Sequence, residues 1–182
     1  IARIEKPGRA AAAIVSEALA EPMRSFPWPK SMTWEPSGLS WVRPLRSILC
    51  LLDGEIVPAE IAGLAASNLT RGHRQMANAP FEVRGFEDYA AKLRERYVML
   101  DRAERMASIR TQALAAAAAA GLTFREDDEL LEEVAGLVEW PVVLTAAFDA
   151  SFLAVPQEVL IGTMRKNQKY FALTDETGRL SE

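Results

Sequence analysis

The chain has 182 residues, of which 49% are hydrophobic and 25% are charged, and its formal net charge is -4. This length fits one domain of ordinary size or one domain with a small appendage, and the composition is that of a soluble globular protein. The single cysteine, Cys50, excludes an internal disulfide framework, and the single histidine, His73, excludes metal sites that need two histidines. Because the overall charge is negative, any contact with nucleic acid requires a local basic patch.

No apolar run approaches the roughly 18–20 residues that span a bilayer, and no signal peptide is evident. Together with the lone thiol, these features predict a cytoplasmic protein with no membrane partner. The chain begins at Ile1 and ends at Glu182, shortly after a turn that would open a hairpin. We therefore expect it to be a piece of a longer protein.

The first third of the chain predicts a helix, an irregular arm and then strands. Apolar residues at helical spacing predict a helix over residues 9–21, ended by Pro22. Residues 24–36 contain three prolines and three aromatic residues, which predicts an extended arm packed over a core. Residues 40–62 are predicted to be rich in strands.

Within that β-rich stretch, Asp53-Gly54 is a strong hairpin signal between two apolar runs. Alternation over residues 56–61 predicts a half-buried strand, and Pro58 places it at an edge or a bulge. Residues 43–52 also suit a helix, and periodicity leaves both interpretations open. The polar stretch 63–80 is predicted to be irregular.

The rest of the chain predicts mostly helices. Helices are expected over residues 86–97, 101–120, 127–138 and 156–168, and strands over 140–148 and 169–174. The apolar face of the helix over 101–120 is expected to consist of Met106, Ile109, Ala113, Leu114 and Ala117. Acidic residues at 126–129 suit the positive end of the following helix dipole.

Strands and helices mix without a regular alternation, which predicts an α+β fold with a mixed, largely antiparallel sheet and packed helices. We expect a helical segment over residues 1–25, which in one interpretation is shared with a preceding region, and an α+β domain over 26–182 that is truncated at its C-terminal end.

Two clusters of cations are the candidate functional residues. The first is Arg71, His73 and Arg74 around Gly72, where planar guanidinium groups suit phosphate oxygens and stacking on bases. An alternative interpretation is a turn whose arginines pair with nearby acids.

The second cluster places three cations beside aromatic residues at a junction between a helix and a strand. Its candidates are Arg165, Lys166, Lys169 and Tyr170. Basic and aromatic neighbours suit an RNA site that combines phosphate contacts with stacking. Alternatively, the cations are solvated residues at the end of the helix.

No catalytic residue and no metal ligand is predicted. The six carboxylates between residues 126 and 133 are expected to form a solvated helix start, and Cys50 lies within an apolar run. The sequence also lacks a glycine-rich loop of the kind that holds phosphates.

Several stretches together resemble one family. They are Lys30-Ser31-Met32-Thr33-Trp34, Val42-Arg43-Pro44-Leu45-Arg46, Leu51-Leu52-Asp53-Gly54-Glu55, Thr70-Arg71-Gly72-His73-Arg74, Leu137-Val138-Glu139-Trp140-Pro141 and Thr163-Met164-Arg165-Lys166-Asn167-Gln168-Lys169-Tyr170-Phe171. In this order and spacing they are similar to the beta subunits of the bacterial two-subunit glycyl-tRNA synthetases. The resemblance runs from about residue 26 to the end of the chain.

The resemblance implies an assembly of two alpha and two beta subunits that charges tRNA for glycine, with ATP and magnesium bound in the alpha subunit and no cofactor in this part. It places the chain in the N-terminal third of the beta subunit. It also implies a fold similar to an editing-type domain of the phenylalanyl-tRNA synthetase beta subunit. Two positions depart from the family pattern, Asn167 where histidine is usual and Thr33 where arginine is frequent.

The leading hypothesis is a non-catalytic module that positions tRNA and supports assembly with the alpha subunit. The seven candidates of the two clusters would then contact RNA or another subunit. The alternatives are a hydrolytic editing-type domain and a purely structural spacer whose cations pair internally with acids.

Overall fold

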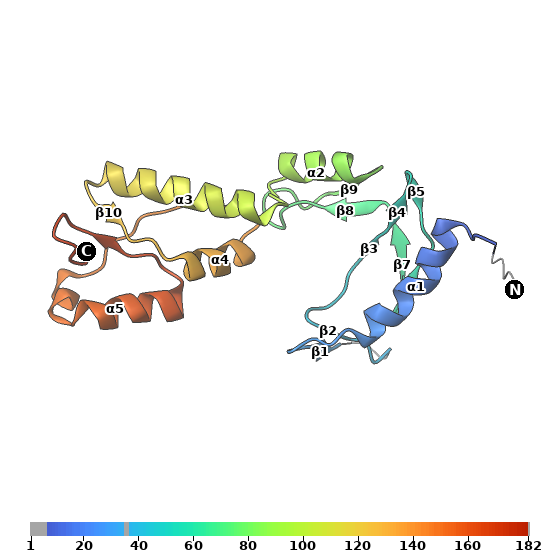
Figure 1. Cartoon of the computed structure of the whole chain (residues 1–182), viewed down its shortest axis with the longest axis horizontal. Helices are drawn as coiled ribbons and strands as arrows, with labels where there is room; N and C mark the ends of the chain where they lie inside the picture. The colour runs from blue at the N-terminus through green and yellow to red at the C-terminus, as the bar shows by residue number, and fades with distance from the viewer. Residues whose placement is uncertain (1–6, 35–36, 182) are drawn as a thin grey trace, which may run out of the picture. The chain divides into compact units, whose positions relative to one another are not determined.

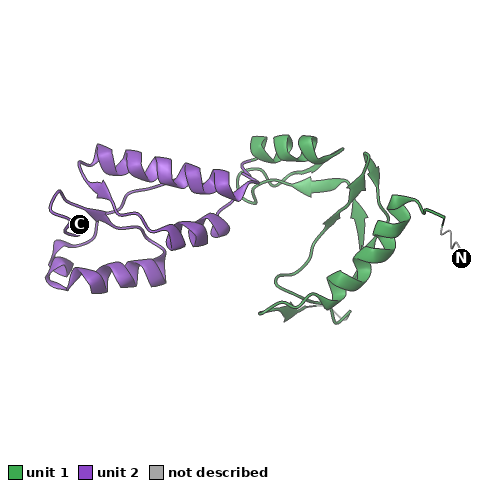
Figure 2. Ribbon diagram, in the orientation of Figure 1, with its two compact units in different colours: residues 1–96 green, residues 97–182 purple. Residues whose placement is uncertain are grey.

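The computed structural model describes residues 7–34 and 37–181, and its contacts divide the chain into two compact units, 1–96 and 97–182 (Figure 2). Both units combine helices with short strands, and most of the strand pairs are antiparallel (Figure 1). The α+β class is therefore confirmed. The division expected near residue 25 stays a prediction. No helix among the described residues is both long enough and apolar enough to cross a membrane.

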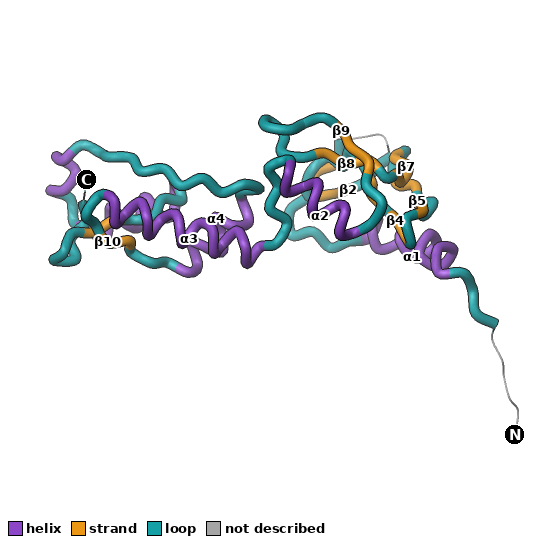
Figure 3. The backbone as a smooth tube through the Cα atoms, turned by 90° about the horizontal axis from the view of Figure 1, so that it is seen from above, coloured by secondary structure: helices purple, strands orange, loops and turns teal. Residues whose placement is uncertain are grey.

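Unit 1 contains two helices and nine short strands among its described residues (Figure 3). They are α1 (Ala11–Ser25), β1 (Met32–Thr33), β2 (Ser40–Trp41), β3 (Ile48–Leu49), β4 (Leu51–Leu52), β5 (Glu55–Ile56), β6 (Glu60–Ile61), β7 (Leu64–Ser67), β8 (Leu69–Arg71), β9 (Pro80–Glu82) and α2 (Phe86–Glu95). Strands β3 and β7 pair in parallel, and β6 pairs with the other side of β7 in antiparallel fashion.

Helix α1 continues through Pro22 to Ser25, so the predicted end at Pro22 is wrong. Proline lacks the N–H that would bond to the carbonyl one turn earlier, but so near the end of a helix this removes only one backbone bond. The Ser25 hydroxyl donates a 2.8 Å hydrogen bond to the carbonyl oxygen of Glu21, which helps to close the last turn. The arm that follows carries β1, which pairs with β2.

The hairpin predicted at Asp53-Gly54 is confirmed. Strands β4 and β5 pair around it, and Asp53 and Gly54 have φ values of 51° and 85°, as a tight two-residue hairpin turn requires. The region before it forms strands β3 and β4, which settles the choice between strand and helix. The single strand predicted over residues 56–61 is wrong, because Ile56 ends β5, Ile61 ends β6 and residues 57–59 belong to no strand. The predicted alternation of burial does hold, since Ile61 is 1% exposed and Ile56 is 45% exposed.

The irregular region predicted over residues 63–80 is only partly correct, because β7 and β8 lie within it. The missed signal is the turn between β6 and β7, where Ala62 has φ 53° and Gly63 has φ 77°. Alanine rarely adopts a positive φ. The Ala62-Gly63 pair therefore does not predict a hairpin turn, whereas Asp53-Gly54 does.

Unit 2 is built on two helices that pack against each other, with a small two-stranded sheet beside them. Its elements are α3 (Arg102–Ala119), β10 (Thr123–Phe124), α4 (Asp128–Leu137), a 3-10 helix (Ala150–Ala154), α5 (Gln157–Thr163), a π-helical segment (Met164–Gln168) and β11 (Leu173–Thr174). The four helices predicted after residue 85 are present: one is α2 of unit 1, two are α3 and α4, and the last is α5 continued by the π-helical segment. Two of them begin with an aspartate cap, since Asp101 accepts from the N–H of Glu104 and Asp127 from that of Leu130.

The strand predicted over residues 140–148 is wrong, and the one over 169–174 is present only as β11. Residues 141–149 belong to no helix or strand. Gln112 of α3 anchors this segment, because its amide donates to the carbonyl of Pro141 at 3.1 Å and accepts from the N–H of Val143 at 3.1 Å. The sequence favours a strand, but a strand needs a partner strand, and the only described strands of unit 2, β10 and β11, pair with each other.

The buried side chains form separate clusters in the two units. In unit 1, Leu39, Ile48 and Ile61 pack together, with Trp34 and Cys50 against them. In unit 2, the core lies between α3, α4 and β10, where the buried residues are Ile109, Ala113, Ala117, Phe124, Leu131 and Ala135. Leu114, predicted to belong to this core, is 45% exposed instead.

Candidate functional site

The first cation cluster occupies the connection between β8 and β9. Arg71 is the last residue of β8, and its guanidinium donates a 2.6 Å hydrogen bond to the carbonyl oxygen of Asn78 across the connection. The Nδ1 atom of His73 accepts from the backbone N–H groups of Gln75 and Met76, both at 3.3 Å. The imidazole therefore shapes the turn, while Arg71 ties its two sides together.

Arg74 differs from its two neighbours in the cluster. It is exposed and has no hydrogen-bond or ion-pair partner among the described residues. Arg71 is exposed as well and bonds only to a backbone carbonyl, so its positive charge is not neutralised by a described carboxylate. The acid pairing that was the alternative interpretation of this cluster is thus not found in the described part of unit 1.

This connection is held against the end of α2. The N–H of His73 donates to the carbonyl oxygen of Arg96 at 2.9 Å, and the guanidinium of Arg96 lies 4.3 Å from the centre of the Phe81 ring in β9. A cation over an aromatic face is a favourable contact. The backbone of the cluster is therefore fixed in place while its two arginine side chains reach solvent.

The second cluster lies in unit 2 and is arranged differently. Arg165 donates to Asp127 through Nε at 2.6 Å and through Nη2 at 3.3 Å, and its Nη2 also donates to Glu129 at 2.7 Å. Lys169 forms an ion pair with Glu133 at 2.8 Å. Two of the three cations in this cluster are thus paired with acids from α4 and its cap.

These pairs shift the protonation equilibria of both partners. The hydrogen bond from Arg165 is the main cause that lowers the pKa of Asp127, and it outweighs the opposing effect of desolvation. The same carboxylate, together with Glu129, raises the pKa of Arg165. The pair is therefore fully ionised at neutral pH and ties the π-helical segment to the start of α4.

The remaining candidates of this cluster face solvent. Lys166 is exposed and has no hydrogen-bond or ion-pair partner in the described region, and the Tyr170 side chain is 59% exposed. Asn167, at the position where the family pattern has histidine, is also exposed in the π-helical segment. The four candidates are neighbours in the chain, and the sequence gave no signal for which acids would pair with Arg165 and Lys169.

The acidic start of α4 connects three elements rather than forming a bare solvated face. Its acids pair with Arg110 and Arg102 of α3 as well as with the π-helical segment. The ion pairs are Arg110 with Glu126 and Asp128, Arg102 with Glu132, Arg165 with Asp127 and Glu129, and Lys169 with Glu133. The six carboxylates thus have structural partners. Within the described ranges, no group of three potential ligands is placed to hold a metal ion.

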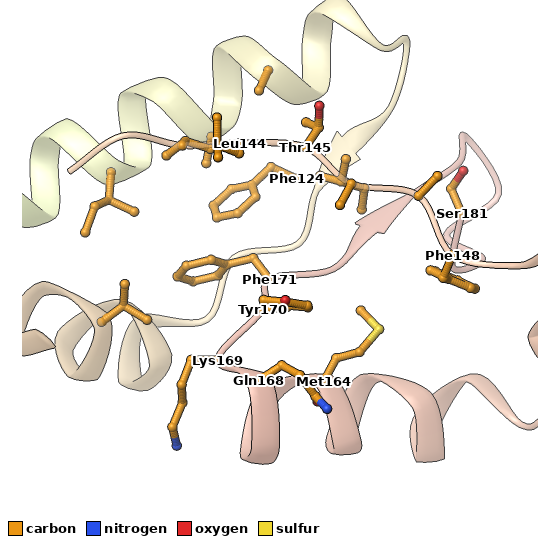
Figure 4. A pocket seen from close by; sticks show the side chains of 18 of the residues that line it. Phe124, Leu144, Thr145, Phe148, Met164, Gln168, Lys169, Tyr170, Phe171 and Ser181 are labelled. Carbon is orange, nitrogen blue, oxygen red and sulfur yellow. The ribbon is translucent and has the colours of Figure 1, made fainter. Parts of the chain in front are cut away.

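A pocket of about 760 Å³ lies in unit 2 and is lined mainly by apolar side chains (Figure 4). Phe124 and Phe171 meet in it with their ring centres 5.3 Å apart. The unpaired segment 142–148 forms one wall, and Tyr170 adds a hydroxyl. Lys169 also contributes to the lining, but its ammonium group points away from the two phenylalanine rings, toward its partner Glu133 (Figure 4).

Charge is unevenly divided between the two units. Residues 1–96 carry 13 basic and 11 acidic side chains, a balance of +2, whereas residues 97–182 carry 8 basic and 14 acidic side chains, a balance of -6. The unit with unneutralised arginines is therefore also the one with positive net charge. This arrangement favours the first cluster over the second as a contact for a polyanion.

Comparison with known proteins identifies the family. A family model described as glycyl-tRNA synthetase beta subunit matches residues 1–182. The chain is similar to the glycine--tRNA ligase beta subunit of Ruegeria sp. (strain TM1040), at 53% identity over 186 residues that cover 100% of this chain and 27% of that protein. It is 55% identical over 182 residues to the subunit of Paracoccus denitrificans (strain Pd 1222), with 97% of this chain and 27% of that protein covered.

A more distant relative is the glycine--tRNA ligase beta subunit of Rickettsia conorii (strain ATCC VR-613 / Malish 7), at 47% identity over 168 residues, 92% of this chain and 25% of that protein. The chain thus spans about a quarter of the length of the curated relatives that it matches. The family match extends over every cluster and element described above, including both cation clusters. The chain belongs to the glycyl-tRNA synthetase beta subunit family.

Proposed function

We propose that this chain is part of the beta subunit of a glycine--tRNA ligase and that it positions tRNA for glycine and supports assembly with the alpha subunit. Adenylation of glycine, with ATP and magnesium, would take place in the alpha subunit. The whole enzyme would contain a second beta subunit and act in the cytoplasm. Family membership supports the ligase, and the charge pattern of unit 1 supports the tRNA role.

One observation carries the tRNA role. Arg71 and Arg74 stand on a rigid connection, are exposed, and have no carboxylate partner among the described residues. Guanidinium groups in this state can bind phosphate oxygens without first losing an ion pair. Arg165 and Lys169 would each have to break an ion pair with a carboxylate before they could bind a phosphate, so we assign them to the internal structure of unit 2. Lys166 and Tyr170 remain secondary candidates for contact.

The test is binding of tRNA for glycine to the full-length subunit, titrated across salt concentrations. Replacing both residues, Arg71→Ala with Arg74→Ala, should weaken binding and reduce the slope of log affinity against log salt by about 2, since each lost phosphate contact removes about one unit. The matched control is Arg125→Ala with Arg179→Ala, which makes the same change of charge in unit 2 at two exposed arginines that have no ion-pair partner among the described residues. An unchanged slope in the first variant would remove this connection from the tRNA site.

Assembly is tested separately from RNA binding. The same Arg71 and Arg74 variant is mixed with the alpha subunit, and complex formation is followed by sedimentation. If the RNA affinity is normal and the complex is lost, the connection is a subunit interface and not a tRNA contact. If both are normal, unit 1 has neither role at this position.

The pocket of unit 2 supports a second candidate function, hydrolytic editing of a wrongly charged tRNA in a domain similar to the editing-type domain of the phenylalanyl enzyme. Its volume of about 760 Å³ suits a small ligand, and Tyr170 and Thr145 lie in its lining. Hydrolysis would need a positioned water, since the described lining residues include no acid–base pair. The measurement is release of amino acid from mischarged tRNA by the full enzyme. A rate that Thr145→Val with Tyr170→Phe does not change would reject this function.

A further inference from the structure

Three aromatic rings of unit 1 form a cluster that the proposed function does not use. Phe26 lies 4.5 Å from Trp28 and 6.1 Å from Trp41, and Trp28 lies 4.8 Å from Trp41, all measured between ring centres. Phe26 follows α1 directly, and Trp41 is the end of β2 (Figure 1). The Phe26 side chain is 51% exposed, so the outer side of the cluster is open to solvent.

Pairing between two short strands holds the cluster together. In the β1–β2 pair, Met32 is opposite Trp41 and Thr33 is opposite Ser40. The hydroxyl groups of Ser31 and Ser40 add a 2.6 Å hydrogen bond across the same pair. Trp34, which follows β1, packs against the buried cluster of Leu39, Ile48 and Ile61. The rings therefore sit on a segment that is anchored to the core of unit 1.

Each ring has a cation two residues away in the chain. Arg24 precedes Phe26, Lys30 follows Trp28 and Arg43 follows Trp41. All three cations are exposed, and none has an ion pair with a described carboxylate. The only acidic residue between Pro22 and Ser47 is Glu35, which lies outside the described residues. The rings and these cations are called here the aromatic–cationic surface.

We propose that the aromatic–cationic surface binds a single-stranded segment of RNA, with an unpaired base stacked on Phe26 and with Lys30 and Arg43 on the adjacent phosphates. Side-chain rings stack on bases that are free of a helix, whereas a duplex keeps its bases out of reach. Exposed cations that have no acidic partner among the described residues suit the repeated charge of the backbone. The core of a protein interface is also rich in aromatic residues and arginine but is depleted in lysine, so Lys30 is the residue of this surface that favours RNA over a protein partner.

This contact is separate from the β8–β9 connection and does not depend on it. It rests on the proposed function only in that the natural ligand would be an unpaired region of the tRNA. The ligand chemistry, an unstacked base with flanking phosphates, is the same for any single-stranded RNA. The two sites can therefore be tested, and can fail, independently.

The experiment measures binding of a labelled oligouridine of about ten nucleotides to the full-length subunit, with a duplex of equal length as competitor. Phe26→Leu keeps an apolar side chain but removes the ring, and we expect it to weaken single-strand binding about five-fold or more. Phe86→Leu is the matched control, because Phe86 is a more exposed ring of unit 1, at 68%, on helix α2. This control should leave the affinity unchanged.

Cation removal and fluorescence give two further readouts. Lys30→Ala with Arg43→Ala should reduce the salt slope by about 1.4, since each phosphate contact with a single strand contributes about 0.7. Binding should also quench tryptophan emission in the native protein, and replacing Trp28 and Trp41 by phenylalanine should reduce that quenching while retaining most of the affinity. Normal circular dichroism of each variant shows that the protein is folded.

Two outcomes would overturn the proposal. One is equal affinity for single strand and duplex together with no effect of Phe26→Leu. The other is normal RNA affinity in the variants combined with loss of the complex with the alpha subunit, which would make this surface a protein interface. Neither outcome bears on the arginines of the β8–β9 connection, whose own salt titration decides the proposed function.

Discussion

The backbone of Gly72 passes so close to Arg96 that a Cβ atom placed on Gly72 would lie 2.4 Å from the Cβ of Arg96 and 2.7 Å from its carbonyl oxygen. The carbonyl oxygen of Ala77 would be 2.9 Å away. Two of these three neighbours are backbone atoms, which cannot rotate away. Only glycine lets the β8–β9 connection lie against the end of α2 in this way.

Replacing Gly72 by alanine should therefore destabilise unit 1. The backbone must move, and the bond between the N–H of His73 and the carbonyl of Arg96 would be strained, so we expect a loss of about 1–3 kcal/mol. Urea denaturation measures the loss. The control is Gly136→Ala in α4, where an added Cβ meets nothing within 4 Å and alanine should be neutral or stabilising. Equal stability of the two variants would contradict the close approach.

The alternation between Ile56 and Ile61 gives a matched pair of core substitutions. Ile61→Ala removes a side chain that is 1% exposed and should cost about 2–5 kcal/mol. Ile56→Ala removes one that is 45% exposed and should cost less than about 1 kcal/mol. Denaturant midpoints of the two variants test this order. The opposite order would mean that residues 56–61 bury the alternate set of side chains.

The ion pairs of Arg165 predict that this residue matters for structure more than for RNA. Arg165→Met keeps the aliphatic stem but leaves Asp127 and Glu129 without their partner, and it should reduce the thermal midpoint of unit 2. It should change the affinity for tRNA less than the loss of Arg71 and Arg74 does. Fluorescence anisotropy with labelled tRNA makes the comparison. A larger loss of affinity in Arg165→Met would return the second cluster to the tRNA site.

Asp127 also predicts how stability changes at low pH. Its pKa in the folded protein is lowered from the ordinary 3.8, first by the hydrogen bond from Arg165. The resulting stabilisation is fully present above the ordinary pKa, and it is lost as the pH falls through the lower pKa of the folded state. Asp127→Asn should therefore be less stable at pH 7 and should lose less stability between pH 4 and pH 2 than the native protein. Unfolding curves across this pH range test the difference, and parallel pH profiles would show that Asp127 is not the responsible group.

Sequence reasoning succeeded where the chemistry is local. The Asp53-Gly54 turn is determined by a few neighbouring residues and is present as predicted, and the acidic start of α4 also lies where the sequence predicts it. Helix α3 was predicted nearly to the residue for the same reason. The family resemblance, read from six stretches in order, agrees with the family match over the whole chain.

It failed where a distant partner decides the outcome. Arg165 is 38 residues from Asp127 in the chain, and nothing near either residue shows that they meet. Leu114 has the right spacing for the buried face of α3, yet it is 45% exposed because no described element covers it. Leu144 is 85% exposed in a segment whose sequence predicts a strand. Spacing indicates which residues can face a neighbour, but only the packing of other elements determines whether one is there.

The uneven charge of the two units has a consequence for the speed of encounters. A polyanion is attracted by the +2 balance of residues 1–96 and repelled by the -6 balance of residues 97–182, however the two units are arranged. At physiological salt the attraction extends only about 8 Å. It therefore acts only when the polyanion is already close, and it favours first contact with unit 1. If the polyanion first contacts unit 1, we expect the association rate measured by stopped flow to rise as the salt concentration is lowered. If it first contacts unit 2, the rate should fall.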